Sequence, residues 1–216
     1  MLSSLTGLLF LSGAGMFAYP FFTDIYTNQF LQKSLEEEFD AITVDSFEEW
    51  EAQVSNQQGM ALTKIVIPAI GVETLVVEGT SPDALRAGAG HYPNTPLPGQ
   101  NGNVAIAGHR TTYGKPFNQI DVLDAGDTIW LITPVGDYRY TVVKYPDSWT
   151  DLDGQAGYPY ITRPTDWDVI APTAVPSLTL TSCHPKGSAR ERIIVRAELT
   201  EKLPPGSWES QQSTPA

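Results

Sequence analysis

Cysteine is nearly absent from this sequence: Cys183 is the one cysteine among 216 residues. A single cysteine cannot form an intramolecular disulfide, and a single thiol cannot supply a cysteine-based zinc site. The sequence also lacks a glycine-rich loop of the kind that holds phosphate groups. We therefore predict a chain without a disulfide, without a metal site and without a cofactor.

Basic residues are scarce as well. The chain has 13 Lys and Arg against 25 Asp and Glu, which gives a net charge of −12, and no run of basic residues occurs. Proteins that bind nucleic acids need such a positive surface, so this class of partner is excluded. The negative charge is concentrated in residues 1–60, which hold nine acidic residues and one lysine, or −8 of the total.

Charge of either sign is missing from residues 5–22, LTGLLFLSGAGMFAYPFF. This length is close to the minimum for a helix that crosses a bilayer, and we predict a transmembrane anchor in residues 1–22. Two alternatives are a cleaved signal peptide and a buried helix of a soluble domain. The first lacks a basic start and a clean cleavage site, and the second is disfavoured by the acidic stretch that follows.

Apolar residues recur at helical spacing in residues 23–60, where three consecutive glutamates at 36–38 mark a solvated side. The apolar positions of this pattern are Ile25, Phe30, Leu31 and Leu35. We interpret this region as an acidic, amphipathic helical stalk and assign it no chemistry.

Short β-rich runs dominate the chain from residue 61 onward, and Gly, Pro and Asn separate them. Seven such runs have the length and β-branched content of strands: LTKIVIPAI, ETLVVEG, NVAIAGH, DTIWLIT, YRYTVVKY, SLTLTS and RIIVRAEL. They predict an all-β domain over residues 61–200 that is closed or nearly closed. Between them, SPDALRAG predicts a short helix capped by Ser81. The Pro- and Ser-rich residues 201–216 predict a disordered tail.

Cys183 follows directly on the predicted strand SLTLTS, next to Thr181 and Ser182. A free cysteine usually acts as a small buried apolar residue, and this packing role is the first alternative. If the N-terminal segment places the domain outside the cell, however, an unpaired thiol is exposed to oxidation. Its retention there favours a chemical role, so Cys183 is our candidate nucleophile.

A reactive thiol needs a group that exchanges protons with it, and the chain has three histidines. His109 ends the run NVAIAGH, so it should project from a strand end into a loop, where catalytic groups are common. His184 adjoins Cys183, but neighbouring residues of a strand point to opposite faces. His91 lies in a Gly- and Pro-rich loop, where it can serve as a lid or packing residue.

Arg192 begins the last predicted strand, nine residues after Cys183. A connecting loop with Gly187 at its turn would bring this arginine back toward the thiol. A guanidinium there can hold a thiolate or donate to the oxyanion of a tetrahedral intermediate. Arg190 and Arg196 compete for this role, and the pattern alone does not choose among the three.

These segments carry a family resemblance. TLTSCHPKGSARERIIV resembles the sortase signature, a strand ending in T-L-x-T-C followed by a loop and an Arg that opens the last strand. NVAIAGHRTTYGKPF resembles the sortase His motif, and HYPNTPLPGQNGN resembles the segment before it. The strings GHRTTYG and CHPKGSARER are most similar to class E sortases of actinobacteria. Ser182 departs from the pattern, which usually has Thr at that position.

The resemblance implies a closed eight-stranded sortase β-barrel with short helices, one strand more than the pattern predicts, and we place the extra strand in residues 157–171. It implies Cys183 as nucleophile, His109 as general acid and base, and Arg192 as the group that holds substrate and oxyanion. Three further residues are implied as substrate-binding candidates: Tyr113, Thr181 and Ser182.

The activity that the resemblance implies is that of a membrane-anchored cysteine transpeptidase. Such an enzyme cleaves a C-terminal L-A-x-T-G or L-P-x-T-G sorting signal between Thr and Gly. It then transfers the acyl group to the amine of a peptidoglycan precursor. The implied partners are surface proteins with a sorting signal, and the implied location is the cell membrane, with a single span and an extracellular catalytic domain. A hydrolytic cysteine peptidase and a non-catalytic envelope β-domain stay open as alternatives.

Overall fold

The computed structural model describes residues 2–55, 57–145, 152 and 159–212. Within these residues the strands are β1 (Ala61–Ile67), β2 (Val72–Glu78), β3 (Ala89–His91), β4 (Asn103–Ala107), β5 (Thr128–Thr133), β6 (Gly136–Val143), β7 (Tyr160–Thr162), β8 (Ser177–His184) and β9 (Glu191–Leu203). The helices are α1 (Leu2–Tyr26), a π-helical turn (Thr27–Leu31), α2 (Gln32–Asp40), α3 (Phe47–Val54), α4 (Pro82–Ala87) and α5 (Ser207–Gln212). Three short 3-10 turns lie at Pro68–Ile70, Ile120–Val122 and Trp167–Ile170.

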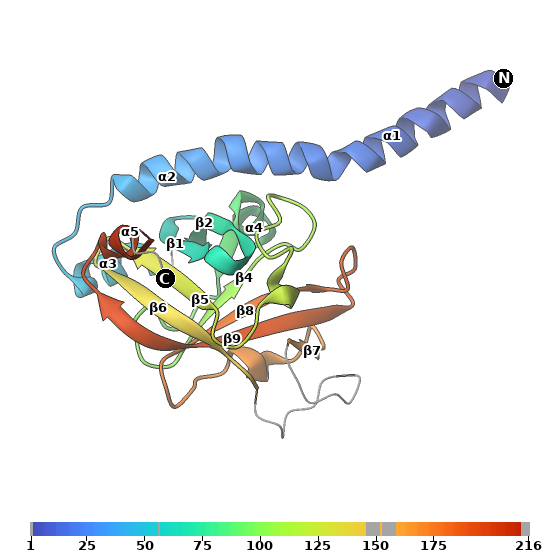
Figure 1. Cartoon of the computed structure of the whole chain (residues 1–216). Coiled ribbons are helices and arrows are strands. Elements are labelled where there is room, and N and C mark those ends of the chain that lie inside the picture. Colours follow the sequence, from blue (N-terminus) through green and yellow to red (C-terminus); the bar gives the residue numbers. More distant parts are fainter. Residues whose placement is uncertain (1, 56, 146–151, 153–158, 213–216) are drawn as a thin grey trace.

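Eight of these strands form a closed barrel in the order β6-β5-β1-β2-β3-β4-β8-β9, because β9 pairs back onto β6 (Figure 1). The β2–β3 and β4–β8 pairs are parallel, and the other pairs of the ring are antiparallel. Closure leaves no free sheet edge in the ring. The predicted closed eight-stranded barrel is therefore confirmed.

The eighth strand of the ring is β3, not a strand within residues 157–171 as we predicted. A strand does occur in that region, β7, but it pairs with β9 outside the ring. β3 could not be predicted from the sequence, because this strand is only three residues long and contains Gly90. A side chain at Gly90 would place its Cβ 2.2 Å from the Gly79 carbonyl oxygen, so only glycine fits where the backbones approach.

The barrel interior is filled by inward-facing residues of the strands and by apolar residues of the segment between β4 and β5. Alternation along each strand places the strand residues on one face, where they are shielded from water. The largest fully buried members of the barrel core are Ile65, Ile67, Ile106, Phe117, Ile120, Leu123, Ile129, Leu131, Tyr140 and Leu178. Ser81 caps α4 by accepting a hydrogen bond from Ala84 N at 3.2 Å, as the sequence predicts.

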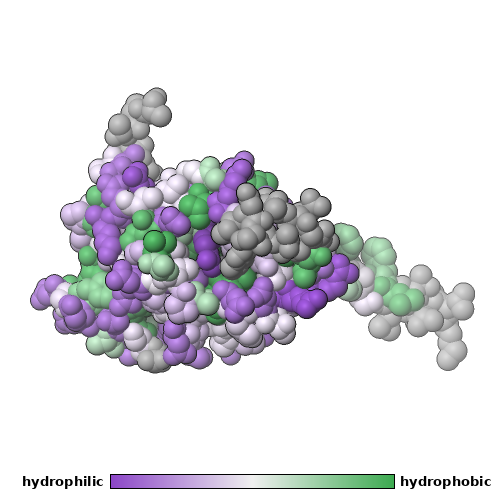
Figure 2. Space-filling model, turned by 90° about the horizontal axis from the view of Figure 1, so that it is seen from below, coloured by the Kyte–Doolittle hydropathy of each residue, from purple (hydrophilic) through white to green (hydrophobic). Residues whose placement is uncertain are grey.

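α1, the π-helical turn and α2 follow one another without a break over residues 2–40, and we call this segment the N-terminal helix. Its C-terminal part crosses the outside of the barrel, and its N-terminal part projects beyond the barrel (Figure 1). Its later part is attached to the barrel, because Leu35 and Phe39 pack against Leu75, Val77 and Ala84. Residues 9–17 of α1 stand clear of the body, and their apolar side chains face solvent (Figure 2). No helix in the described part of the chain has both the length and the apolar character that a membrane span requires. The predicted span in residues 1–22 is thus not confirmed.

The predicted stalk over residues 23–60 is not one continuous helix. The helix ends at Asp40, and a separate helix, α3, begins after Ser46, whose hydroxyl accepts from Glu49 N. Trp50 and Val54 of α3 are fully buried beside Leu62. The amphipathic pattern in this second half therefore reflects packing on the barrel rather than a free stalk.

The described part of the tail, up to residue 212, also differs from its prediction, and residues 213–216 lie outside the described residues. We expected disorder from residue 201, but β9 extends to Leu203 and α5 follows. Leu203 and Trp208 pack on an apolar cluster of Val66, Trp130 and Ile132 outside the ring. This cluster supplies the buried surface that composition alone did not indicate.

Candidate active site

Cys183 and Arg192 are brought together by the register of β8 and β9. In this antiparallel pair Cys183 lies directly opposite Arg192. Directly opposed residues project to the same face of the sheet. Both are half-buried, so a thiol and a guanidinium share one partly shielded surface.

His109 reaches the same end of the barrel because β4 and β8 are parallel. Their register pairs Ala107 with Thr181, and the Gly108 amide still donates to the Thr181 carbonyl at 3.1 Å. His109 and Cys183 each lie two residues beyond that pair, so the two chains present them at one edge. Sequence analysis identified both residues, but it could not predict this register.

One cavity of about 270 Å³ is lined by all three candidate residues, Cys183, His109 and Arg192. Thr162, from β7, and Trp167, from the turn that follows it, also line this cavity. The cavity therefore has a thiol, an imidazole and a guanidinium among its lining groups, which are the types of group that acyl transfer would need.

The structure distinguishes Arg192 from its two competitors. The Arg192 Nη1 atom donates to the carbonyl oxygens of Ala189 and Glu191 at 3.0 and 2.9 Å, which fixes the guanidinium at the cavity edge. Arg190 is exposed and pairs with Glu191. Arg196 donates to Val169 O and lies over the Tyr145 ring. Of the three arginines, only Arg192 is among the residues that line the cavity.

Burial lowers the pKa of His109. The physical cause is the partial removal of its imidazole from water, which disfavours the charged form. The ring lies beside that of Tyr113, with 5.0 Å between centroids. A neutral imidazole is therefore favoured near neutral pH, and its protonated form is a stronger acid than ordinary histidine.

Arg110 is a buried residue that sequence analysis missed. Its guanidinium pairs with Asp121 at 2.9 Å and donates to the Asn118 carbonyl at 2.8 Å and, at 3.4 Å, to the Cys183 carbonyl. It thus ties the loop that follows His109 to the end of β8. An arginine next to the candidate histidine was the available signal, but one basic residue in a loop usually indicates a solvated side chain.

Thr181 and Ser182 both line the cavity, but their hydroxyls already have partners. Ser182 Oγ donates to the Gly108 carbonyl at 2.7 Å, which joins β8 to the residue before His109. Thr181 Oγ1 bonds to the Tyr92 hydroxyl at 2.9 Å, and Tyr92 lines the cavity too. These residues therefore line the cavity with hydroxyl groups that are already hydrogen-bonded within the protein.

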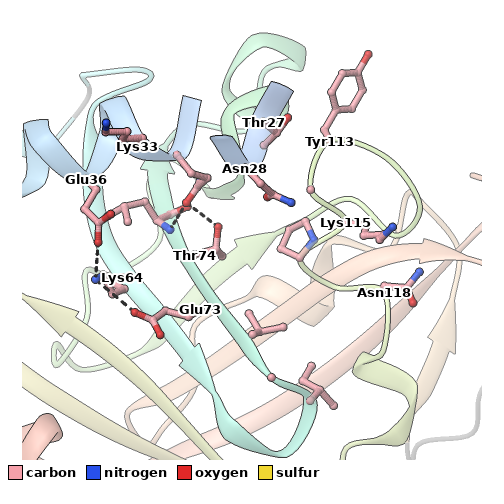
Figure 3. A pocket seen from close by; sticks show the side chains of 18 of the residues that line it. Thr27, Asn28, Lys33, Glu36, Lys64, Glu73, Thr74, Tyr113, Lys115 and Asn118 are labelled. Atoms are coloured by element: carbon pink, nitrogen blue, oxygen red, sulfur yellow. Dashed lines mark hydrogen bonds and ion pairs between the residues drawn. The ribbon is translucent and has the colours of Figure 1, made fainter. Parts of the chain in front are cut away.

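Tyr113 does not line the cavity that contains Cys183. It lines a neighbouring polar groove of about 640 Å³ between the N-terminal helix, β2 and the loop that follows His109 (Figure 3). Its link to the site is the contact of its ring with His109.

The two other histidines lie elsewhere. His184 faces Glu191 in the β8–β9 register, one position beyond the Cys183 pair. His91 is buried; its Nδ1 lies 2.6 Å from Glu78 Oε2 and its Nε2 lies 3.0 Å from the Pro96 carbonyl. This arrangement gives His91 a packing role in the barrel wall. Across the described residues no group of three or more His, Cys, Asp or Glu could hold a metal ion.

Known proteins are similar to this chain in sequence and in fold. Residues 65–200 match the family model of the sortase domain. The chain is 31% identical to sortase D of Bacillus subtilis over 147 residues, which is 67% of this chain and 66% of that protein. It is 32% identical to sortase SrtE1 of Streptomyces coelicolor over 162 residues, which is 68% of this chain and 42% of that protein.

A solved structure, a sortase D5 transpeptidase of Clostridium perfringens, superposes with a TM-score of 0.65 at 31% identity. This match covers 79% of the present chain and 99% of that chain. The chain spans about two thirds of the length of the Bacillus subtilis relative and less than half of the length of the Streptomyces coelicolor relative.

Proposed function

Because the chain belongs to the sortase family, with its transpeptidase domain at residues 65–200, we propose that it cleaves a C-terminal sorting signal between Thr and Gly. It then transfers the acyl group to an amine of a peptidoglycan precursor. One observation carries this proposal: the side chains of Cys183, His109 and Arg192 meet at a single cavity.

In the first half-reaction the Cys183 thiolate attacks the carbonyl carbon of the substrate threonine, and a carbon–sulfur bond forms. The oxyanion that develops is stabilised by the Arg192 guanidinium. The tetrahedral intermediate collapses when the carbon–nitrogen bond breaks, and His109 donates its proton to the leaving glycine amine. The lowered pKa of His109 favours this donation.

In the second half-reaction an amine attacks the thioester that remains on Cys183. Neutral His109 accepts a proton from the attacking amine, and the carbon–sulfur bond breaks to restore the thiolate. Covalent capture divides one amide exchange into two easier steps. The half-buried position of the thiol supports transfer to an amine over loss to bulk water.

We assign the sorting signal to the L-A-x-T-G type, as in class E sortases, with L-P-x-T-G as the competing motif. The support is the sequence GHRTTYG around His109. Relatives of class D and class E match this chain about equally, at 31% and 32% identity. Tyr113 beside His109 is the assigned specificity residue, while Thr181 and Ser182 form the floor against which the peptide backbone would lie.

We also propose that α1 holds the barrel at the cell membrane, with the catalytic domain outside. No charged residue precedes Asp24, and the exposed apolar side chains include Leu9, Phe10, Leu11, Met16, Phe17, Phe21 and Phe22. A helix that is apolar all round is suited to lipid. Flotation of the full chain with lipid vesicles, and its loss in a Phe10→Ser/Phe17→Ser variant, would support this location; an unbound full chain would contradict it.

Mass spectrometry of the products tests the proposed reaction. The full chain is incubated with L-A-x-T-G and L-P-x-T-G peptides, with and without an amine, and Cys183→Ala serves as control. We expect an acyl–amine product and a thioester on Cys183. Release of the acid alone, even with amine present, would instead indicate a hydrolytic peptidase. No product, together with slow alkylation of the thiol, would indicate a non-catalytic envelope domain.

A further inference from the structure

The carboxylate of Asp24, on helix α1, binds the loop that follows His109. Asp24 Oδ1 accepts a hydrogen bond from the Gly114 amide at 3.0 Å, and Oδ2 accepts one from the Lys115 ammonium at 2.6 Å. The Asp24 side chain is 13% exposed. Charge-assisted hydrogen bonds of this kind are stronger than neutral ones, and partial burial protects them from salt.

The loop needs such a partner because its backbone is strained. Three consecutive residues have positive φ: Tyr113 at 52°, Gly114 at 75° and Lys115 at 40°. Left-handed conformations are unfavourable for residues other than glycine and persist only where the surroundings impose them. A Cβ on Gly114 would lie 2.7 Å from Asn28 Oδ1, so the helix approaches this turn closely.

The strained turn presents Tyr113 to His109. The Tyr113 ring lies 5.0 Å from the imidazole centroid, and its hydroxyl bonds to the Tyr19 hydroxyl of α1 at 2.5 Å. Tyr113 is therefore held between the helix and the imidazole. Figure 3 shows Tyr113 and Lys115 on the loop beside Thr27 and Asn28 of the helix.

The helix is itself fixed to the barrel independently of this loop. The Gln32 side chain donates to the Ala87 carbonyl at 2.6 Å and accepts from the Leu75 amide at 2.7 Å. Thr27 Oγ1 donates to the Arg86 carbonyl at 2.9 Å. The helix thus provides a rigid support from which Asp24 can hold the loop.

We propose that Asp24 is a positioning residue for His109: it fixes the turn at residues 113–115 and so keeps the Tyr113 ring packed against the imidazole. The N-terminal helix is, on this view, a functional part of the active site. The consequence for turnover rests on the function proposed above, whereas the consequence for the packing of His109 does not.

The test uses the full chain with Asp24→Ala and Asp24→Asn, and with Asp40→Ala as the matched control. Asp40 is an exposed acid at the end of α2, which continues from α1 through the π-helical turn, and it lies 16 residues beyond Asp24. Because modest misplacement of an acid–base group is costly, we expect Asp24→Ala to lower kcat about tenfold, with little change in KM for the peptide. Asp24→Asn should lie between it and the wild type, since its amide oxygen can still accept from Gly114.

Two readouts do not depend on activity. Amide hydrogen exchange at residues 113–115 should be faster in Asp24→Ala. The ring-current shift that Tyr113 imposes on the His109 ring protons in NMR spectra should be reduced, as in a Tyr113→Leu reference. Unchanged exchange and an unchanged shift in Asp24→Ala would overturn the proposal even if no peptide substrate is turned over.

A third outcome separates the two proposals. If the wild type transfers peptide and Asp24→Ala exchanges faster but keeps its kcat, the positioning role is overturned while the transpeptidase function stands. Equal losses of kcat in Asp24→Ala and Asp40→Ala would also overturn it, because they would indicate a general effect of charge on the helix.

Discussion

The two sides of the active site are built in different ways. Cys183 and Arg192 sit on paired strands, and eight consecutive residue pairs from Ser177 to His184 fix the β8–β9 register. His109 follows β4, in a segment without regular structure up to Ile120. This segment is tied to distant parts of the chain by the contact of Arg110 with the Cys183 carbonyl and by that of Gly114 with Asp24.

This difference separates substitutions that affect chemistry from those that affect geometry. Backbone pairing survives most side-chain changes, so replacements of Cys183 or Arg192 should remove a chemical group and leave the site in place. His109 is not held by a comparable series of paired backbone residues. Its geometry should respond to changes at contacts that never touch substrate.

The strongest way to break the strand side is Cys183→Ala. We expect cleavage and transfer to be abolished, because no other thiol exists in the chain. The β8–β9 pairing should persist, so the melting temperature should stay close to that of the wild type. Product analysis and thermal unfolding check these two expectations, and any covalent acyl-enzyme in the variant would contradict the assignment.

The histidine side is broken most directly by His109→Ala. We expect a loss of about a hundredfold or more in kcat/KM, the usual magnitude for a general acid and base. His184→Ala is the matched control and should lose much less, because His184 alternates with Cys183 along β8 and pairs with Glu191. Steady-state kinetics measure both, and equal losses would show that the strand geometry does not select His109.

Arg192→Lys sharpens the comparison within the strand side. Lysine keeps the charge but lacks the planar guanidinium, so the oxyanion loses directed hydrogen bonds. We expect kcat to fall at least about tenfold, a barrier change of roughly 1.4 kcal/mol, with a smaller effect on KM.

Arg190→Ala is the control for this substitution and should behave like the wild type. The Arg190 side chain is exposed, and its ion pair is with the neighbouring Glu191. Near-normal turnover of Arg192→Lys would mean that a diffuse positive charge suffices. A dead Arg190→Ala beside an active Arg192→Ala would move the role to Arg190.

The same division explains what the sequence could predict. Seven strands followed from β-branched runs between turn residues, and Cys183, His109 and Arg192 followed from strand ends and a family motif. The strand β3 was not predicted, because three residues around Gly90 are too few to show a periodic pattern. The contacts of Arg110 and Asp24 were not predicted either, because their partners, Cys183 and Gly114, are 73 and 90 residues away in sequence.

The smallest expected effect concerns pH and again separates the two sides. Burial lowers the pKa of His109 below the ordinary 6.5, so the unfolded chain binds a proton at this residue before the folded chain does. The free energy of unfolding should therefore fall as the pH is lowered from above 6.5 toward the folded-state pKa, and His109→Gln should lack this contribution.

Chemical denaturation of both proteins across this pH range gives the difference, in which contributions common to the two proteins cancel. We expect the free energy of unfolding of the wild type, relative to that of His109→Gln, to decrease on acidification. The slope of this decrease against pH should be smaller than the slope for a whole proton, because the imidazole is only partly buried. An increase on acidification would mean that the fold stabilises the imidazolium. His109 would then be held by charge as well as by the packing of its loop, whereas the strand side is held by backbone pairing.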